Sequence, residues 1–326
     1  MKKAITILTL IIAIASCKKE VSDEFHAYTG QQLNDTVWVT TGAYSAICDT
    51  ISNTLNTIPF YVDSFSCSSG TVMKLKGNGD VVVSIPPICG ATGLGNPSSV
   101  KIAVGVLSKK GDFIRALSHT KNIDKPLEAS CCFYVKLMNT YGQEIFMPQG
   151  VNYSIAWTDA AATNKMSFYE GIGVRNNDTL INWLPSINGR INQTFQAGSS
   201  TSVKGYEISS NVTRWIGGLR YIDTTAGTSS VNISFSALNF TNKNTIAYTV
   251  LKDTKTVIRM TADNVNKIFY CNKVPKGANA TIVTISLIDN QFYLGIKEVT
   301  TGSVNYFKIT PDKKTLNDIQ SYLDNL

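Results

Sequence analysis

Hydrolytic sites are most often built from histidine and acidic side chains. Histidine is scarce in this chain. Its two histidines are His26 and His119. A Ser-His-Asp hydrolase needs a histidine held between a nucleophile and a carboxylate. Asp112 and Asp124 lie near His119, but no Gly-x-Ser-x-Gly elbow precedes a candidate serine. We therefore interpret His119 as a surface loop residue and assign no catalytic residue.

Paired carboxylates offer a second kind of chemistry, since a glycosidase needs two acids that converge across a sugar. Four acids in the middle of the chain could converge, and nothing in their spacing singles out a pair: Glu144, Asp159, Glu170 and Glu207. The glycine-rich stretch Gly90 to Gly95 lacks the lysine and the following helix of a phosphate loop. A non-enzymatic role is favoured, and a cryptic hydrolase acting on envelope or environmental glycan is the alternative.

The chain has seven cysteines, and the six after Cys17 are Cys48, Cys67, Cys89, Cys131, Cys132 and Cys271. Their spacing fits no zinc signature and includes no Cys-x-x-Cys, so we expect neither a metal nor a cofactor. An even number outside the cytoplasm permits disulfides, and the pair Cys48 and Cys67, which flank one strand-and-turn segment, is the bridge we expect first. Small buried thiols in a β core are the alternative for each cysteine.

Four aromatic residues in loop-rich sequence are candidates for ligand contact: Trp183, Trp215, Tyr206 and Tyr221. Such rings can stack on sugar faces or fill a protein interface. The alternative is that the tryptophans are core anchors at a domain junction.

The amino terminus carries the most specific signal. Lys2 and Lys3 precede an apolar run from Ala4 to Ala15, and the run ends in Ile14-Ala15-Ser16-Cys17. This is the pattern of a signal peptide, and the run is too short to span a bilayer stably. Ile-Ala-Ser-Cys resembles the lipobox of bacterial lipoproteins. The resemblance implies cleavage before Cys17, a lipid on its thiol and anchorage in a membrane. In the Gram-negative lipoproteins that this segment resembles, an Asp just after the cysteine is the usual signal for retention in the inner membrane. Lys18 and Lys19 stand there instead, so the resemblance implies the outer membrane, on its cell-surface or periplasmic side.

Charge argues against a nucleic-acid partner. The net charge is +7, and removal of residues 1 to 16 takes away two lysines and lowers it to +5. The longest basic runs in the body are pairs such as Lys109-Lys110. We interpret them as a solvated surface, and we expect a glycan or an envelope protein as partner.

Hydrophobic patterning predicts an all-β fold: two β-sandwich-like domains after a signal peptide and tether, with a short C-terminal helix. We divide the chain into a signal peptide (1–16), a tether (17–35), a first sandwich (36–160), a loop-rich β region (161–230) and a second sandwich with the helix (231–326). Period-two alternation predicts strands around residues 100–106, 131–137, 153–157 and 231–235. In the second of these, Cys131 should point inward and Cys132 outward.

Turn chemistry predicts further features. Asn78-Gly79 and Asp289-Asn290 should form hairpin turns, and Lys110-Gly111 a turn before an extended segment. Thr310 should cap the final helix, with Pro311 in its first position. Its apolar stripe would consist of Leu316, Ile319, Tyr322, Leu323 and Leu326.

From Gly79 to Asp159 the chain resembles the first β-domain of uncharacterised surface lipoproteins of Bacteroidetes type. The resemblance is carried by four segments: Val81 to Pro86, Phe133-Tyr134-Val135, Gly142 to Ile145 and the strand at Tyr153. It continues more loosely through Met166 to Gly171, Asn182-Trp183, Arg214 to Ile216 and Val274 to Gly277. That group has no assigned activity, so the resemblance implies a class and a cellular address: a lipid-anchored envelope protein with a binding or structural role.

Thr36, Thr50, Thr179 and Thr224 each follow an aspartate. They resemble the Asp-Ser/Thr-apolar sites that organisms of Bacteroidetes type O-glycosylate on exported proteins. The alternative is that Asp-Thr pairs are simply good turn formers.

Overall fold

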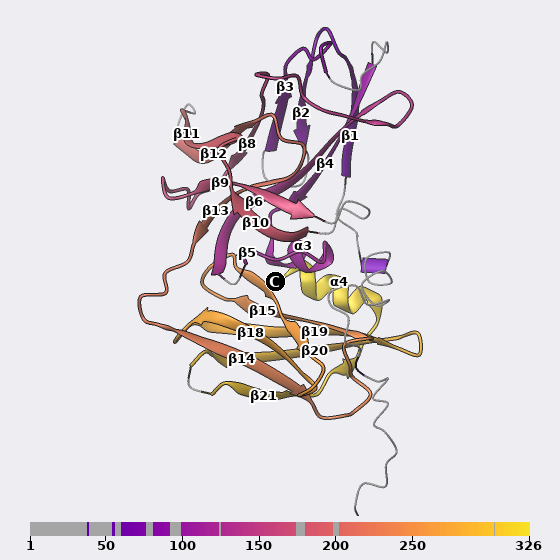
Figure 1. Ribbon diagram of the computed structural model, residues 1–326, viewed down its shortest axis with the longest axis vertical. Coiled ribbons are helices and arrows are strands. Elements are labelled where there is room, and N and C mark those ends of the chain that lie inside the picture. The colour runs from indigo at the N-terminus through magenta and orange to yellow at the C-terminus, as the bar shows by residue number, and fades with distance from the viewer. Residues whose placement is uncertain are drawn as a thin grey trace, which may run out of the picture. The chain divides into compact units, whose positions relative to one another are not determined.

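The computed structural model describes residue 38 and residues 54–55, 60–75, 81–91, 99–123, 125–173, 180–197, 202–302 and 304–326. All of them belong to one compact unit, Trp38–Leu326. Their strands form four sheets (Figure 1). The predicted all-β fold class, with two sandwiches and a C-terminal helix, is confirmed.

The first sandwich consists of sheets 1 and 2. In spatial order, sheet 1 contains β1 (Phe60–Ser66), β4 (Ser99–Leu107), β6 (Lys125–Asn139), β13 (Arg214–Tyr221), β9 (Ser167–Gly173) and β10 (Leu180–Pro185), with β5 (Lys121–Asn122) and β7 (Glu144–Ile145) paired to β6. Sheet 2 contains β11 (Gly189–Ala197), β12 (Ser202–Ser210), β8 (Tyr153–Thr158), β3 (Val81–Ile85) and β2 (Thr71–Leu75). Alternate residues of β4 and β8 are buried between the sheets, as the period of two predicts.

The first sandwich extends well past residue 160, which corrects the predicted boundary. Residues 161–230, expected to be a loop-rich β region outside the first sandwich, contain strands β9 to β13, and these complete both sheets of that sandwich. β13 pairs with β6 over most of its length, and β12 pairs with β8. Strands joined by irregular loops were expected here, but their pairing with the first sandwich was not, because their partners lie far away in the sequence.

The second sandwich consists of sheets 3 and 4. Sheet 3 contains β17 (Thr261–Asp263), β18 (Ile268–Pro275), β14 (Thr228–Phe235) and β21 (Tyr306–Ile309). Sheet 4 contains β16 (Val257–Arg259), β15 (Thr245–Leu251), β19 (Asn279–Ile288), β20 (Gln291–Thr300) and β22 (Asp312–Lys313). Asp289 and Asn290 join β19 to β20 with φ values of 50° and 59°, which confirms the predicted hairpin turn.

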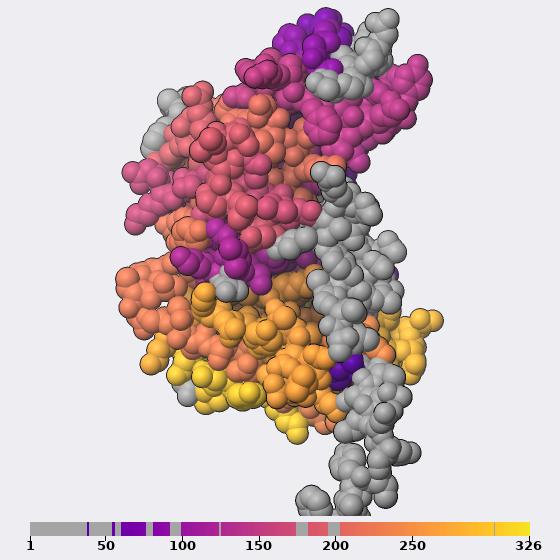
Figure 2. Space-filling view, in the orientation of Figure 1, coloured from indigo at the N-terminus to yellow at the C-terminus, as the bar shows by residue number. Residues whose placement is uncertain are grey.

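A third core joins the two sandwiches. It lies between the face of sheet 1 that points away from sheet 2 and the face of sheet 4 that points away from sheet 3, together with helices α3 (Lys110–Arg115) and α4 (Leu316–Asp324). In the space-filling view, violet atoms of the first sandwich lie directly against orange atoms of the second (Figure 2). Because the junction is apolar and buried, the two sandwiches should move as one body.

This third core explains why Cys132 is not exposed. Cys131 and Cys132 lie on opposite faces of β6, as their alternation predicts. The face that carries Cys132 is covered at the junction, so its side chain is fully buried. The sequence pattern gave the correct face but did not reveal that a second layer covers it.

Both helices differ from the predictions. α4 begins at Leu316, because the Thr315 hydroxyl accepts the N–H of Asp318 and the Asp318 carboxylate accepts the N–H of Thr315. Pro311 therefore precedes β22 and does not start the helix. Lys110 to Arg115 are helical and not extended, since the Asp112 carboxylate accepts the N–H groups of Ser108 and Lys109 at 2.9 and 2.8 Å. Ile319 and Leu323 of α4 are buried, as predicted.

Among the described residues, no helix has the length and apolar character needed to cross a membrane.

Candidate functional site

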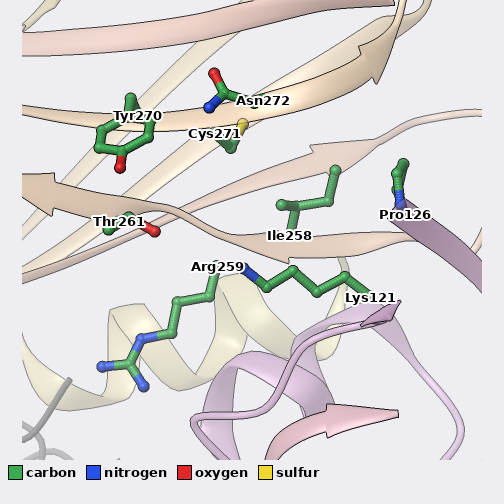
Figure 3. A pocket seen from close by; sticks show the side chains of 8 residues that line it. All are labelled: Lys121, Pro126, Ile258, Arg259, Thr261, Tyr270, Cys271 and Asn272. Carbon is green, nitrogen blue, oxygen red and sulfur yellow. The ribbon is translucent and has the colours of Figure 1, made fainter. Parts of the chain in front are cut away.

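A small pocket lies where sheet 3 approaches strands β5 and β6 of the first sandwich. Its lining is drawn from both sandwiches and consists of Lys121, Pro126, Ile258, Arg259, Thr261, Tyr270, Cys271 and Asn272 (Figure 3). The cavity measures about 90 Å³. Sites that enclose a whole small molecule are roughly 300–1,000 Å³. This pocket can therefore admit one substituent of a ligand, such as a carboxylate or a sulfate.

Lys121 is held at the pocket by a tight hairpin. β5 pairs with the start of β6 through Lys121 and Pro126, and the turn places Ile123 at φ 53°. The preceding residue, Thr120, is hydrogen-bonded to Val257 of β16. The hairpin is therefore fixed to the second sandwich immediately beside Arg259.

Arg259 and Thr261 reach the pocket because the chain changes sheets between them. β16 belongs to sheet 4 and ends at Arg259, and β17 belongs to sheet 3 and starts at Thr261. Met260 between them is buried, and its N–H donates to Ala247 at 2.9 Å. Thr261 pairs with Tyr270 of β18, and in Figure 3 the Tyr270 hydroxyl points toward Thr261.

The pocket has a positive electrostatic character. Lys121 and Arg259 supply two cations, and Thr261, Tyr270 and Asn272 supply neutral donors. Among the described residues of the lining there is no carboxylate. Burial raises the pKa of the Cys271 thiol to about 11, and the opposing influences are its hydrogen bond with Thr249 and the charge of Lys121. The charge of Lys121 therefore influences the Cys271 thiol, which lies in the buried wall of the pocket. Cations and donors in this combination suit an anionic group.

Tyr221 is the predicted aromatic that lies near this site. It is 48% exposed, and its hydroxyl accepts a hydrogen bond from Nδ2 of Asn122 at 2.7 Å, in the hairpin that carries Lys121. Nζ of Lys125 lies 5.7 Å from the centre of its ring. This contact adds a third cation next to the pocket.

The other three predicted aromatics are part of the cores. Trp183, Tyr206 and Trp215 are 0%, 2% and 8% exposed. Nε1 of Trp183 donates to the carbonyl of His119 at 2.7 Å, and the Tyr206 hydroxyl accepts the N–H of Thr163 at 2.6 Å. The prediction that these three rings face a ligand is wrong, and the alternative interpretation of the tryptophans as core anchors is correct.

His119 is also buried, at 4% exposure, and not a surface loop residue. Its carbonyl accepts the indole N–H of Trp183, a residue of the core between the sandwiches, and the short polar sequence around His119 did not indicate this burial.

Three of the acids considered for glycosidase chemistry have separate structural partners. Glu144 forms an ion pair with Arg214 at 2.9 Å, and Glu170 accepts a hydrogen bond from Nδ2 of Asn188 at 3.0 Å. Asp159 accepts a hydrogen bond from Ser130 at 2.5 Å. Within the described ranges, no group of three or more His, Cys, Asp or Glu residues could hold a metal ion.

The disulfide connects Cys67 to Cys89, which corrects the expected pairing of Cys67 with Cys48. Cys67 follows β1 and Cys89 follows β3, and the hairpin of β2 and β3 brings them together. The N–H of Ile88 donates to the carbonyl of Cys67 at 2.7 Å beside the bridge. Proximity in the sequence predicted the wrong partner for Cys67, because strand pairing determines which cysteines come into contact.

Of the predicted modification sites, Thr224 is exposed in the loop between β13 and β14. The Asp223 carboxylate accepts the N–H of Thr225 at 2.8 Å, so this Asp-Thr pair does form a turn. Cys17, Cys48, Thr36, Thr50 and Thr179 lie outside the described residues.

The pocket residues could not be selected from the sequence, because they come from five strands in two distant parts of the chain and form no motif.

No family model, no curated protein and no solved structure matches the chain.

Proposed function

We propose that this protein is a lipid-anchored envelope protein whose two sandwiches form a binding module for a glycan that carries an acidic group. The observation that supports this most directly is the pocket, whose lining includes Lys121, Arg259 and three neutral donors and whose volume is that of one substituent. Two cations near one small cavity favour a carboxylate or sulfate over a neutral group.

The apolar junction supports a binding role for this pocket. Its lining comes from both sandwiches, and its geometry would be lost if they moved independently. The third core and the hydrogen bonds between Thr120 and Val257 hold the two sides together. A site that is rigid before the ligand arrives loses less entropy on binding.

The proposed location in the cell envelope rests on the amino-terminal sequence. Cys17 would carry the lipid, and Lys18 and Lys19 would direct the protein to the outer membrane, on its cell-surface or periplasmic side. There the body would meet envelope or environmental glycans.

Binding of monosaccharides to the detergent-solubilised lipoprotein tests the proposal. We expect galacturonate or galactose sulfate to bind and neutral galactose not to bind. Arg259→Gln and Lys121→Gln should each weaken binding about tenfold or more, because a hydrogen bond to a charged group contributes about 1.5–3 kcal/mol. Lys204→Gln is the matched control, since Lys204 is exposed on β12. Equal binding of the acidic and neutral sugars, or unchanged binding by both pocket variants, would contradict the proposal.

A further inference from the structure

The outer face of sheet 3 carries a row of polar and aromatic side chains that begins at the pocket. The strand register places Thr261 opposite Tyr270, Tyr270 opposite Asn232, and Asn232 opposite Tyr306. Strands β18, β14 and β21, which carry the last three, lie side by side in Figure 1. Thr261 and Tyr270 also line the pocket, so the row and the pocket are continuous.

The alternation of each strand shows that the row faces away from the core. Val231 and Ile233 on β14 are fully buried, so Asn232 between them points outward. The same holds for Tyr270, which lies between the buried residues Phe269 and Cys271. Tyr306 is 63% exposed.

The spacing of the row fits a chain of sugars. Neighbouring strands are about 4.8 Å apart, so the backbones of Tyr270 and Tyr306 are separated by roughly 10 Å, a span that a disaccharide covers. The Asn232 side chain donates through Nδ2 to the carbonyl of Asn305 at 3.0 Å and to Ser230 at 3.4 Å. The carbonyl oxygen of Asn232 can therefore accept a sugar hydroxyl between the two rings.

We infer that this row is an extended glycan platform and that the ligand is an acidic polysaccharide. One acidic group would occupy the pocket beside Lys121 and Arg259, and the following sugars would lie along Tyr270, Asn232 and Tyr306. This inference rests on the proposed function and adds the length and orientation of the ligand.

The composition of the face favours a glycan over a protein. Around the tyrosines it presents small polar side chains, namely Ser230, Ser234 and Asn272, whereas the centre of a protein interface is enriched in apolar and aromatic groups. Lys308 is exposed, pairs with Ser234 and extends positive charge beyond Tyr306. Asp263, a carboxylate at the β17 end, accepts hydrogen bonds from Val265 and Asn266 of its own turn.

The test compares ligands of different length on the full lipoprotein in detergent. The probes are tetragalacturonate and a sulfated galactan tetrasaccharide, which distinguish a carboxylate from a sulfate, with the corresponding monosaccharides and neutral galactotetraose. We expect at least one acidic tetrasaccharide to bind about tenfold or more tightly than its monosaccharide. Tyr306→Ala should remove about tenfold of the tetrasaccharide affinity and leave the monosaccharide unchanged. Tyr306→Phe should keep the affinity, because stacking needs the ring and not the hydroxyl.

Tyr141→Ala is the control, because Tyr141 is 83% exposed in the turn between β6 and β7 and is not part of the row. Equal affinity for the monosaccharide and the tetrasaccharide, or no effect of Tyr306→Ala, would contradict the inference of an extended platform. The effect of Arg259→Gln on monosaccharide binding would still test the pocket independently. If no acidic probe binds, the proposed function fails together with the platform.

Discussion

Thr120 and Val257 are joined by hydrogen bonds in both directions, and these connect the first sandwich to the second. The N–H of Thr120 donates to the carbonyl of Val257 at 2.7 Å, and the N–H of Val257 donates to the Thr120 hydroxyl oxygen at 2.9 Å. Both residues are fully buried. The contact continues along β6, where the N–H of Ala129 donates to the carbonyl of Lys255 at 3.0 Å. Short strand-like pairing therefore accompanies the apolar junction and fixes the hairpin of Lys121.

Thr120→Val tests the importance of this contact. The substitution keeps the shape of the side chain but leaves the N–H of Val257 buried without its acceptor. We expect the free energy of unfolding to fall by about 1–3 kcal/mol, as measured by urea denaturation. Thr224→Val, in an exposed loop, should change it by less than about 0.5 kcal/mol. Equal effects of the two substitutions would show that the hydrogen bond contributes little.

The disulfide between Cys67 and Cys89 should stabilise the end of the first sandwich that contains β2 and β3. The two cysteines are 22 residues apart in the sequence. Closing a loop of that length restricts the unfolded chain and stabilises the fold by about 3 kcal/mol. Cys89→Ser should therefore lower the midpoint of urea denaturation, and peptide mapping without reduction should recover Cys67 linked to Cys89. A peptide linking Cys67 to Cys48 would contradict this pairing.

All four tryptophans are buried, Trp38 and Trp157 included. Iodide should therefore quench the fluorescence of the native protein weakly and that of the unfolded protein strongly. Trp183→Phe removes the donor to the His119 carbonyl and leaves a cavity, and we expect a loss of about 1–3 kcal/mol in unfolding free energy. Tyr221→Phe, at the exposed aromatic, should have a smaller effect. Strong quenching of the native state would indicate that a tryptophan is exposed.

The sequence predicted the strands whose own residues alternate clearly, such as β4, β8 and β14, because a local period of two is sufficient to mark a half-buried strand. It did not predict features that depend on distant partners. Cys132 and His119 are buried by a layer that their local sequence does not encode. Trp183 and Trp215 lie in loop-like sequence and yet anchor the junction. The pocket depends on Lys121 and Arg259 meeting through the contact of Thr120 with Val257, so it could only be found after the chain had been folded.

Buried thiols should make stability depend on pH in the alkaline range. Burial raises the folded-state pKa of Cys271 from 9.0 to about 11. Between these values the unfolded chain binds fewer protons than the folded protein, so the free energy of unfolding falls as pH rises. The contribution of this thiol is complete below pH 9 and is lost by up to about 1.4 kcal/mol per pH unit above it. Cys271→Ala should therefore show a shallower decline than the parent protein between pH 9 and 11 in urea denaturation. Parallel declines would contradict the assignment.

The proposed lipid anchor can be tested by replacing a single atom, the sulfur of Cys17. Lipid attachment requires a thiol, because the diacylglycerol is carried on sulfur, and Cys17→Ser replaces that sulfur with oxygen while changing the size of the side chain very little. Several acyl chains, each contributing about 0.8 kcal/mol per buried methylene, hold a protein on a membrane firmly. We expect Cys17→Ser to abolish incorporation of an alkyne-labelled fatty acid in the native host and to leave a precursor that retains residues 1 to 16. Cys271→Ser is the matched control, because it removes a buried thiol from the body and should leave the labelling intact. Full labelling of the Cys17→Ser protein would refute the anchor and, with it, the membrane address.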